Sequence, residues 1–363
     1  MALLEVKDLR TSFKTEDGIV TAVDGVSFSV EKGQTLGIVG ESGSGKSVTC
    51  LTIMGLNARR STMSSGEALW KGKDILSMSG DELRRIRGNE IAMIFQDPMT
   101  SLNPVHTIGK QLVEAVQLHR DVTVRVAKAR ALELLKAVGI PKAEARIDDY
   151  PHQFSGGMRQ RVMIAMALIN DPDLLIADEP TTALDVTTQA QILNLMKRLQ
   201  DDFGSAIIMI THDLGVVAET ADDVVVMYAA KVVEHAKVHD LFNRPQHPYT
   251  CGLMGSLPRL DADLERLVQI PGQPPSLLRP PGGCRFHPRC PYVMGVCRTT
   301  EPPLGALSAI PPTSRPVTST RRRRTAREPS WSRRRWRRPK WRRNRGRTVR
   351  WRVRWSCTAT SCS

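Results

Sequence analysis

The chain lacks the long apolar runs of a membrane-spanning protein. None of its apolar stretches approaches the roughly eighteen residues that a helix needs to cross a bilayer. Its opening, MALLEVKDLR, has neither a basic segment nor a long apolar segment of the kind that directs secretion. These absences exclude helical membrane spans and a secretion signal, and they predict a chain that stays in the cytoplasm.

Cysteine, aromatic residues and, near the end of the chain, acidic residues are scarce. The seven cysteines of a cytoplasmic chain are expected to be thiols or metal ligands rather than disulfides. Residues 314–363 hold 18 Arg and one Lys against one Glu, out of 52 basic and 37 acidic residues in all. The remainder, with 33 basic and 36 acidic residues, is nearly neutral, so the net charge of +15 reflects a basic tail.

The first motif with chemical meaning is a glycine-rich loop. The apolar run Gln34–Gly40 predicts a buried strand, the sequence GESGSGKS follows at Gly40–Ser47, and Val48–Met54 predicts a helix. This is the G-x-x-x-x-G-K-S pattern in the strand–loop–helix context that it requires, which disfavours a chance Gly/Ser loop. Lys46 is expected to reach the β- and γ-phosphates of a nucleotide, and the Ser47 hydroxyl to ligate Mg²⁺.

Polar side chains follow three further apolar runs. Leu174–Asp178 predicts a strand that ends in a carboxylate, and Glu179 comes next. Asp178 suits the metal side of a phosphate site, and Glu179 suits the polarisation of an attacking water. His212 follows the predicted strand Ala206–Thr211, and Gln96 follows Ile91–Phe95. Alone, each of these residues could be structural; beside a phosphate loop, they indicate a hydrolytic site.

Ser155-Gly156-Gly157 stands where a helix begins, although glycines are poor helix formers. One interpretation is a turn with Ser155 as N-cap. The other is an anion site, because a helix N-terminus presents free N–H groups and glycines let a phosphate come close. A second phosphate signal in the chain favours the anion site.

Together these motifs resemble those of the ATP-binding cassette (ABC) ATPases. The motifs stand in that family's order and spacing: the loop Gly40–Ser47, Gln96, the Ser-Gly-Gly turn, Asp178-Glu179, Ala183-Leu184-Asp185 and His212. The resemblance covers about residues 3–300. One departure is Met158, where many members have Gln. The resemblance implies that two cassettes pack head-to-tail, so that the Ser-Gly-Gly turn contacts the γ-phosphate of ATP held by the other cassette.

The resemblance also implies an α/β fold of the P-loop NTPase type, with an antiparallel β subdomain and an α-helical subdomain. We expect the ABC ATPase domain at residues 1–240, with its helical subdomain at about 98–157, where Val105–Leu118 and Val122–Ala137 predict helices. A C-terminal extension rich in Pro, Gly and Cys is expected at 241–304, and a tail at 305–363. Val186–Phe203 predicts an amphipathic helix, and the absence of a repeat predicts one cassette.

The expected site residues follow from this assignment. The catalytic set is Glu179, His212, Lys46 and Gln96, and the metal set for Mg²⁺ is Ser47, Gln96 and Asp178. The family implies an aromatic residue that stacks on adenine, a role for which Phe13 is the candidate, although Phe13 also suits a strand core. The other expected ATP-binding residues are Gly40, Glu41, Ser42, Gly43, Ser44, Gly45, Lys46, Ser47 and Val48; those acting in trans are Ser155, Gly156 and Gly157, with Asp185 in the adjoining D-loop.

The extension narrows the resemblance to the oligopeptide/dipeptide importers, whose pattern Asp97–Pro104 also matches. Nickel importers share these features, so the solute stays open. Cys284, Cys290 and Cys297 are spaced C-x5-C-x6-C, which is either a set of ordinary thiols or part of a metal or [4Fe–4S] site. The fourth cysteine that some relatives use is missing before Cys357.

The tail after Leu304 has neither a helical nor a strand period. Its recurring Arg and Trp resemble a GC-rich gene read out of frame, so we expect it to be disordered. If it were selected, Arg for phosphate and Trp for base stacking would suit a nucleic-acid-binding module.

The expected function is ATP hydrolysis that energises an importer of dipeptides or oligopeptides. The implied partners are a second ATPase subunit, two transmembrane permease subunits and an extracytoplasmic substrate-binding protein, with the chain peripheral on the cytoplasmic face of the inner membrane. No specific nucleic acid is expected. The alternatives are a nickel or other small-solute importer, a soluble ABC ATPase, or the nucleic-acid module.

Overall fold

The computed structural model describes residues 2–58, 60–97, 101–181, 186–256 and 269–304. Ten strands form two sheets in this part of the chain. The smaller sheet is antiparallel, in the order β2 (Gly18–Val30), β1 (Leu4–Thr15), β4 (Thr62–Trp70) and β5 (Lys73–Asp74). The larger sheet has the order β10 (Lys231–Lys237), β9 (Asp223–Tyr228), β3 (Thr35–Val39), β8 (Ala206–Thr211), β7 (Leu174–Asp178) and β6 (Ile91–Ile94).

The larger sheet is parallel except for β10, which pairs antiparallel with β9. Its central strands are apolar on both faces, as expected of a parallel sheet covered on both sides. In β7, Leu174 and Ile176 join the core shared with the small sheet and α1 (Lys46–Ile53), whereas Leu175 and Ala177 join the core shared with the helical region. Each strand therefore holds two cores together.

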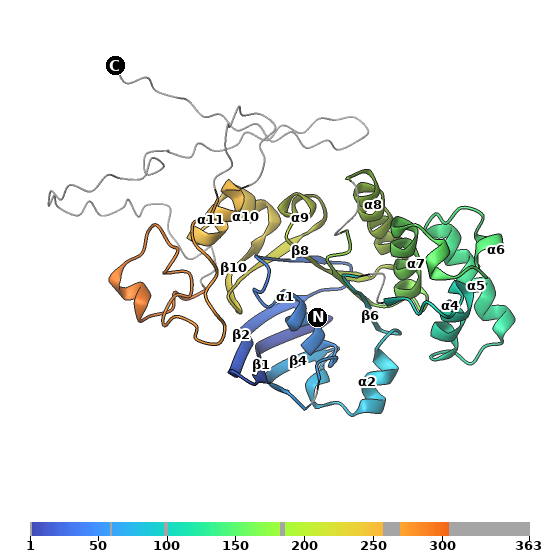
Figure 1. Cartoon of the computed structure of the whole chain (residues 1–363), viewed down its shortest axis with the longest axis horizontal. Coiled ribbons are helices and arrows are strands. Elements are labelled where there is room, and N and C mark those ends of the chain that lie inside the picture. The colour runs from blue at the N-terminus through green and yellow to red at the C-terminus, as the bar shows by residue number, and fades with distance from the viewer. Residues whose placement is uncertain (1, 59, 98–100, 182–185, 257–268, 305–363) are drawn as a thin grey trace, which may run out of the picture.

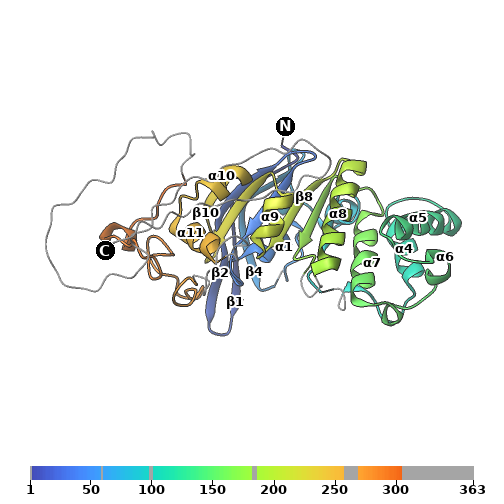
Figure 2. The ribbon, with the colours of Figure 1, turned by 90° about the horizontal axis from the view of Figure 1, so that it is seen from above.

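The helices gather around the sheets, and two groups lie at opposite ends of the molecule (Figure 1 and Figure 2). At one end are α4 (Ile108–Gln117), α5 (Val124–Ala137) and α6 (Ala143–Arg146), within the segment predicted as the helical subdomain. At the other end are α10 (Val238–Asn243), α11 (Pro248–Gly255) and the loops of residues 269–304. The remaining α-helices with described ends are α2 (Gly80–Ile86), α7 (Gly156–Leu168), α8 (Val186–Phe203) and α9 (Leu214–Thr220), and single 3-10 turns lie at Ile75–Ser77, Pro151–Gln153 and Gly295–Arg298.

Helix starts were predicted less accurately than helix ends. α4 and α5 begin two or three residues later than the apolar pattern predicts, because Thr107 and Thr123 are N-caps whose hydroxyls accept hydrogen bonds from Lys110 N and Val126 N. The region after residue 240 also holds more helix than its Pro/Gly content predicts. Pro248 occupies the first turn of α11, where the missing N–H of proline costs no helical hydrogen bond.

No helix in the described part of the chain is both long enough and apolar enough to cross a membrane. The predicted disorder of the tail concerns residues outside the described part.

Candidate nucleotide site

The loop Gly40–Ser47 connects β3 to α1, and its glycines are required by the backbone. A Cβ at Gly40 would lie 2.1 Å from the Met227 carbonyl oxygen, and one at Gly45 would lie 2.2 Å from the Ala22 carbonyl oxygen. Gly40, Gly43 and Gly45 all have positive φ angles, which L-residues rarely adopt. The loop is therefore a backbone cradle that no larger residue could form at Gly40 or Gly45.

Lys46 is buried at the start of α1 and turns back over the loop. Its Nζ donates to the carbonyl oxygens of Gly40 at 2.9 Å and Glu41 at 3.1 Å. Burial lowers the pKa of Lys46, and the nearby carboxylates of Glu179 and Asp178 oppose that shift. The Ser44 hydroxyl is buried in the same loop without a hydrogen-bond partner. A buried cation and an unpartnered hydroxyl in a glycine cradle fit the binding of phosphate oxygens.

Asp178 lies beside the loop at the carboxyl end of β7. Its Oδ1 accepts a hydrogen bond from the Ser47 hydroxyl at 2.9 Å, and its side chain is buried. Burial raises the pKa of Asp178, whereas the Ser47 hydrogen bond lowers it. Hydroxyl and carboxylate oxygens are the ligands that Mg²⁺ prefers, so this pair fits the expected metal.

Glu179 contacts side chains that follow two other strands of the sheet, β6 and β8. Gln96 Nε2 donates to Glu179 Oε2 at 3.1 Å, and His212 Nδ1 lies 3.5 Å from the same oxygen. The Glu179 side chain is 16% exposed and that of His212 is 63% exposed, so the carboxylate is largely shielded from solvent and the imidazole is not. The structure thus brings together Gln96, Glu179 and His212, which lie far apart in the sequence.

Glu179 has a strained backbone. Its φ angle is +46°, and its N–H donates to the Ile210 carbonyl oxygen at 2.9 Å. A left-handed conformation at a non-glycine residue costs about 1–3 kcal/mol and persists only where the surroundings enforce it. Here the hydrogen bond to β8 holds the carboxylate at the sheet edge.

The Ser-Gly-Gly turn lies at the N-terminus of α7 and is largely exposed. Ser155 Oγ accepts a hydrogen bond from Met158 N at 3.4 Å, which confirms the N-cap interpretation. Two residues after Met158, Gln160 is buried and donates to the Pro180 carbonyl oxygen at 2.6 Å. Within the described residues, no hydrogen bond joins the Ser155 turn to the phosphate loop of the same chain. The predicted contact in trans is compatible with this exposure and stays a prediction.

Two other expected residues are less informative. Phe13 is half-buried on β1, where it pairs with Val20 and Thr62, and the structure does not decide between adenine stacking and strand packing. Val48 is half-buried in the first turn of α1. Asp185 and the adjoining Ala183-Leu184 lie outside the described residues.

Three residues that the motif search missed contact the site from other elements. Gln160 links α7 to the segment after Glu179, while Tyr249 and Arg289 both contact Glu41 in the phosphate loop. No local pattern distinguishes Arg289 within the sequence RFHPRCP. Only the fold brings it to residue 41.

The three cysteines of the extension do not support the metal or iron–sulfur interpretation. Cys284, Cys290 and Cys297 are free and half-buried, and burial raises the pKa of the Cys284 and Cys290 thiols. Among the residues with a described position, no group of three or more His, Cys, Asp or Glu side chains could hold a metal ion. Cys357 and Cys362 lie outside the described residues.

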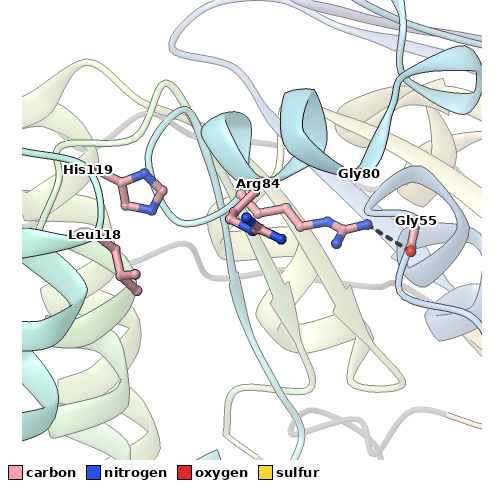
Figure 3. A pocket seen from close by; sticks show the side chains of 6 residues that line it. Gly55, Gly80, Arg84, Leu118 and His119 are labelled. Carbon is pink, nitrogen blue, oxygen red and sulfur yellow. Dashed lines mark hydrogen bonds between the residues drawn. The ribbon is translucent and has the colours of Figure 1, made fainter.

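A separate hollow of about 450 Å³ lies between α2 and the turn after α4 (Figure 3). It is lined by Gly55, Gly80, Arg84, Arg87, Leu118 and His119. The Arg87 guanidinium donates to the carbonyl oxygens of Met54 at 2.7 Å and Gly55 at 2.8 Å, just beyond the end of α1. One end of α1 therefore meets the phosphate loop and the other meets this hollow.

Comparison with known proteins agrees with this geometry. Residues 23–182 match the family model described as ABC transporter, and residues 233–297 match the one described as oligopeptide/dipeptide transporter, C-terminal region. The dipeptide transport ATP-binding protein of Lactococcus lactis is 56% identical over 302 residues, which cover 83% of this chain and 86% of that protein. The oligopeptide transport ATP-binding protein of Escherichia coli is 54% identical over 301 residues, which cover 83% of this chain and 89% of that protein.

A solved structure supports the fold. The dimeric, post-hydrolysis ATP-binding cassette bound to ADP and Pi aligns with a TM-score of 0.59 and 28% identity, over 65% of this chain and 98% of its own. The motifs, the fold and these matches agree: the chain belongs to the ATP-binding proteins of the ABC transporter family, is an ABC-type ATPase, and carries at residues 233–297 the C-terminal region of the oligopeptide/dipeptide transporters.

Proposed function

We propose that this chain binds and hydrolyses ATP to energise an importer of dipeptides or oligopeptides. The observation that carries the proposal is the convergence of Ser47 with Asp178, and of Gln96 and His212 with Glu179. The names of the relatives, which are peptide transport ATP-binding proteins, support the peptide as solute.

The phosphates of ATP bind in the cradle of Gly40–Ser47. The N–H groups of the loop and of the first turn of α1 donate to the phosphate oxygens, and Lys46 exchanges its bonds to the loop carbonyls for the β- and γ-phosphates. Ser47 and Asp178 would hold Mg²⁺, with Gln96 as the further ligand that the family implies; when bound, the ion would supply charge neutralisation on the phosphates. We include no iron–sulfur cluster in this proposal.

Glu179 acts as the general base. Its carboxylate accepts a proton from the attacking water as that water approaches the γ-phosphate, and Gln96 orients the carboxylate by its hydrogen bond. His212 lies beside Glu179 and is largely exposed, so its imidazole can donate to the γ-phosphate. Asp178 does not act as the base in this proposal, because its Oδ1 accepts the hydrogen bond from the Ser47 hydroxyl.

The exposed Ser155-Gly156-Gly157 turn completes the site of a second cassette. Ser155 and Gly156 are exposed at the N-terminus of α7, where the first N–H groups of a helix have no helical partner and can donate to a phosphate that another chain holds. A related cassette was solved as a dimer, which supports pairing.

The remaining partners are two transmembrane permease subunits and an extracytoplasmic binding protein, with this chain peripheral on the cytoplasmic face of the membrane. The hollow between α2 and α4 is our candidate for the permease contact, because α1 connects it to the phosphate loop (Figure 3). The eight residues of α1 span about 12 Å, at about 1.5 Å per residue. Movement of the loop on ATP binding would therefore reach the hollow directly.

Reconstitution tests this function. The chain is co-expressed with the transmembrane permease subunits and placed in proteoliposomes with the binding protein. We expect ATP hydrolysis to rise, and labelled peptide to enter the compartment that holds this chain and ATP, only when a dipeptide or oligopeptide is supplied. Stimulation by nickel ions and not by peptides would replace the peptide importer with the nickel alternative.

A further inference from the structure

An arginine of the C-terminal extension makes a two-pronged ion pair with the phosphate loop. Arg289 Nη1 lies 2.8 Å from Glu41 Oε2, and Arg289 Nη2 lies 3.2 Å from Glu41 Oε1. The Arg289 side chain is 6% exposed and that of Glu41 is 25% exposed. A bidentate pair that is shielded from water is stronger and more directional than an ordinary surface ion pair.

A tyrosine from α11 holds the backbone of the same residue. The Tyr249 hydroxyl accepts a hydrogen bond from Glu41 N at 2.8 Å, and the Tyr249 ring is fully buried. Burial raises the pKa of Tyr249, so the hydroxyl stays neutral. The start of α11 is held in turn by Glu234, which accepts hydrogen bonds from Gln246 N and His247 N. The Glu41 N–H is thus engaged by the extension rather than left for a phosphate.

Arg289 is itself immobilised by its surroundings. Its guanidinium donates to the carbonyl oxygens of Pro271 and Ile270 and lies 3.3 Å from the Tyr228 hydroxyl. The rings of Tyr228, Tyr249 and Phe286 pack together, with centroids 4.6–5.4 Å apart. The extension therefore presents both contacts to Glu41 from a rigid aromatic base.

Glu41 passes these constraints to the nucleotide-binding groups. Its carbonyl oxygen accepts hydrogen bonds from Lys46 Nζ at 3.1 Å and from Ser44 N at 3.2 Å. Holding the N–H and the side chain of Glu41 therefore sets the peptide group against which Lys46 rests. Arg289 also neutralises a carboxylate that would otherwise repel the phosphates of ATP.

We propose that Arg289 and Tyr249 are positioning residues for the phosphate loop: the C-terminal extension shapes the loop and cancels the charge of Glu41, and ATP affinity depends on both contacts. This inference rests on the proposed ATP site at Gly40–Ser47. It gives the extension a role in nucleotide binding by its own chain.

The test compares ATP dissociation constants and steady-state kinetics of full-length variants with their thermal unfolding. Tyr249→Phe removes one hydroxyl and keeps the ring packing, and we expect ATP affinity to fall roughly 3- to 10-fold, the size of one net hydrogen bond. Arg289→Gln should weaken ATP binding by roughly 10-fold or more, because it frees the Glu41 charge. KM for ATP should rise more than kcat falls in both variants.

Two controls separate positioning from general destabilisation. Glu301→Gln breaks the ion pair of the extension with Lys231, which does not involve Glu41, and should leave ATP affinity unchanged. In the Arg289→Gln background, Glu41→Gln removes the unpaired charge and should restore part of the affinity. Arg289→Gln alone serves as the reference for that rescue.

The outcomes distinguish this inference from the proposed function. If the native chain binds ATP and Lys46→Ala does not, while Tyr249→Phe and Arg289→Gln bind ATP like the native chain, the positioning role is wrong and the ATP site stands. Should Glu301→Gln weaken ATP binding as much as Tyr249→Phe, the effect is general stability and the inference also fails. If Lys46→Ala binds ATP as well as the native chain, the proposed ATP site itself is wrong.

Discussion

Two neighbouring carboxylates of the site differ in environment more than in chemistry. Asp178 is buried against Ser47, whereas Glu179 is partly exposed and contacts Gln96 and His212. The strained φ angle of Glu179 lets the side chains of two consecutive residues at the end of β7 contact different groups. This difference in environment supports the proposed division between a metal ligand at Asp178 and a general base at Glu179.

We expect Glu179→Gln to keep ATP binding and to lower turnover by about 10²–10⁴-fold. The amide keeps the size of the side chain and can still meet Gln96, but it cannot accept a proton from water. Single-turnover hydrolysis, measured beside ATP binding on the same preparation, checks this outcome. Hydrolysis at the native rate would remove Glu179 from the role of base.

Lys46→Ala should act at the binding step. Loss of a charge-assisted contact to phosphate typically lowers affinity by about 10–100-fold, because such a bond contributes about 1.5–3 kcal/mol. Titration with a fluorescent ATP analogue measures the change. The opposite pattern, with native affinity and slow turnover, would make Lys46 a catalytic group without a binding role.

At the scale of elements, the start of α7 combines two requirements. Ser155 satisfies the first turn as an N-cap, while Gly156 and Gly157 keep the surface of that turn open. A Cβ at Gly157 would lie 3.1 Å from Thr188 Cγ2, which is tight but needs only a small shift. The space inside the chain therefore does not by itself demand a glycine at position 157.

Gly157→Asp should block closure of the cassette pair while ATP still binds to the loop of the same chain. The added carboxylate would face the γ-phosphate of the ATP held by the other cassette and repel it. ATP-dependent dimerisation, measured by light scattering with the slow-hydrolysing Glu179→Gln chain as background, checks this. Gly157→Ala is the matched control, since it adds the Cβ without the charge. A loss of ATP affinity as large as that of Lys46→Ala would contradict an action in trans.

At the scale of the whole molecule, the extension is part of the nucleotide-binding unit rather than an appendage. Phe286 is buried in one core with Tyr249 and Leu241, and Arg285 is ion-paired with Asp24 of β2. These contacts join residues near 285 to the small sheet and to the phosphate loop. Removal of the extension should therefore cost stability as well as ATP affinity.

The chain ending at Leu304 should by contrast keep ATP binding and hydrolysis. The 18 Arg and one Lys of residues 314–363 lack the apolar periodicity that builds a core. They should contribute only salt-sensitive adhesion to anionic surfaces, worth about 1 kcal/mol per basic residue near the surface. Vesicle co-sedimentation at low and high salt, beside ATPase assays, measures both properties. A shortened chain that binds ATP but cannot assemble or hydrolyse it would show that the tail is functional.

The chemistry of the site could be predicted from the sequence because its motifs are local. G-x-x-x-x-G-K-S, an Asp-Glu pair after an apolar run and a His after another each combine a strand with the polar residue at its end. In parallel strands those ends meet at one edge, so the predicted catalytic residues were placed near one another. The starts of α4 and α5 differ from the prediction by two or three residues, because the capping residues Thr107 and Thr123 set them and the apolar pattern does not.

The contacts that shape the site were decided by the tertiary structure alone. Gln96 and Glu179 lie 83 residues apart and meet only because β6 and β7 are neighbours in the sheet. Glu41 and Arg289 lie 248 residues apart and meet because α11 and the following loops pack against the end of β9. A single sequence carries no periodicity that pairs such residues: what the sequence determined is which groups can bind and hydrolyse ATP, and what the fold determined is which residues hold those groups in place.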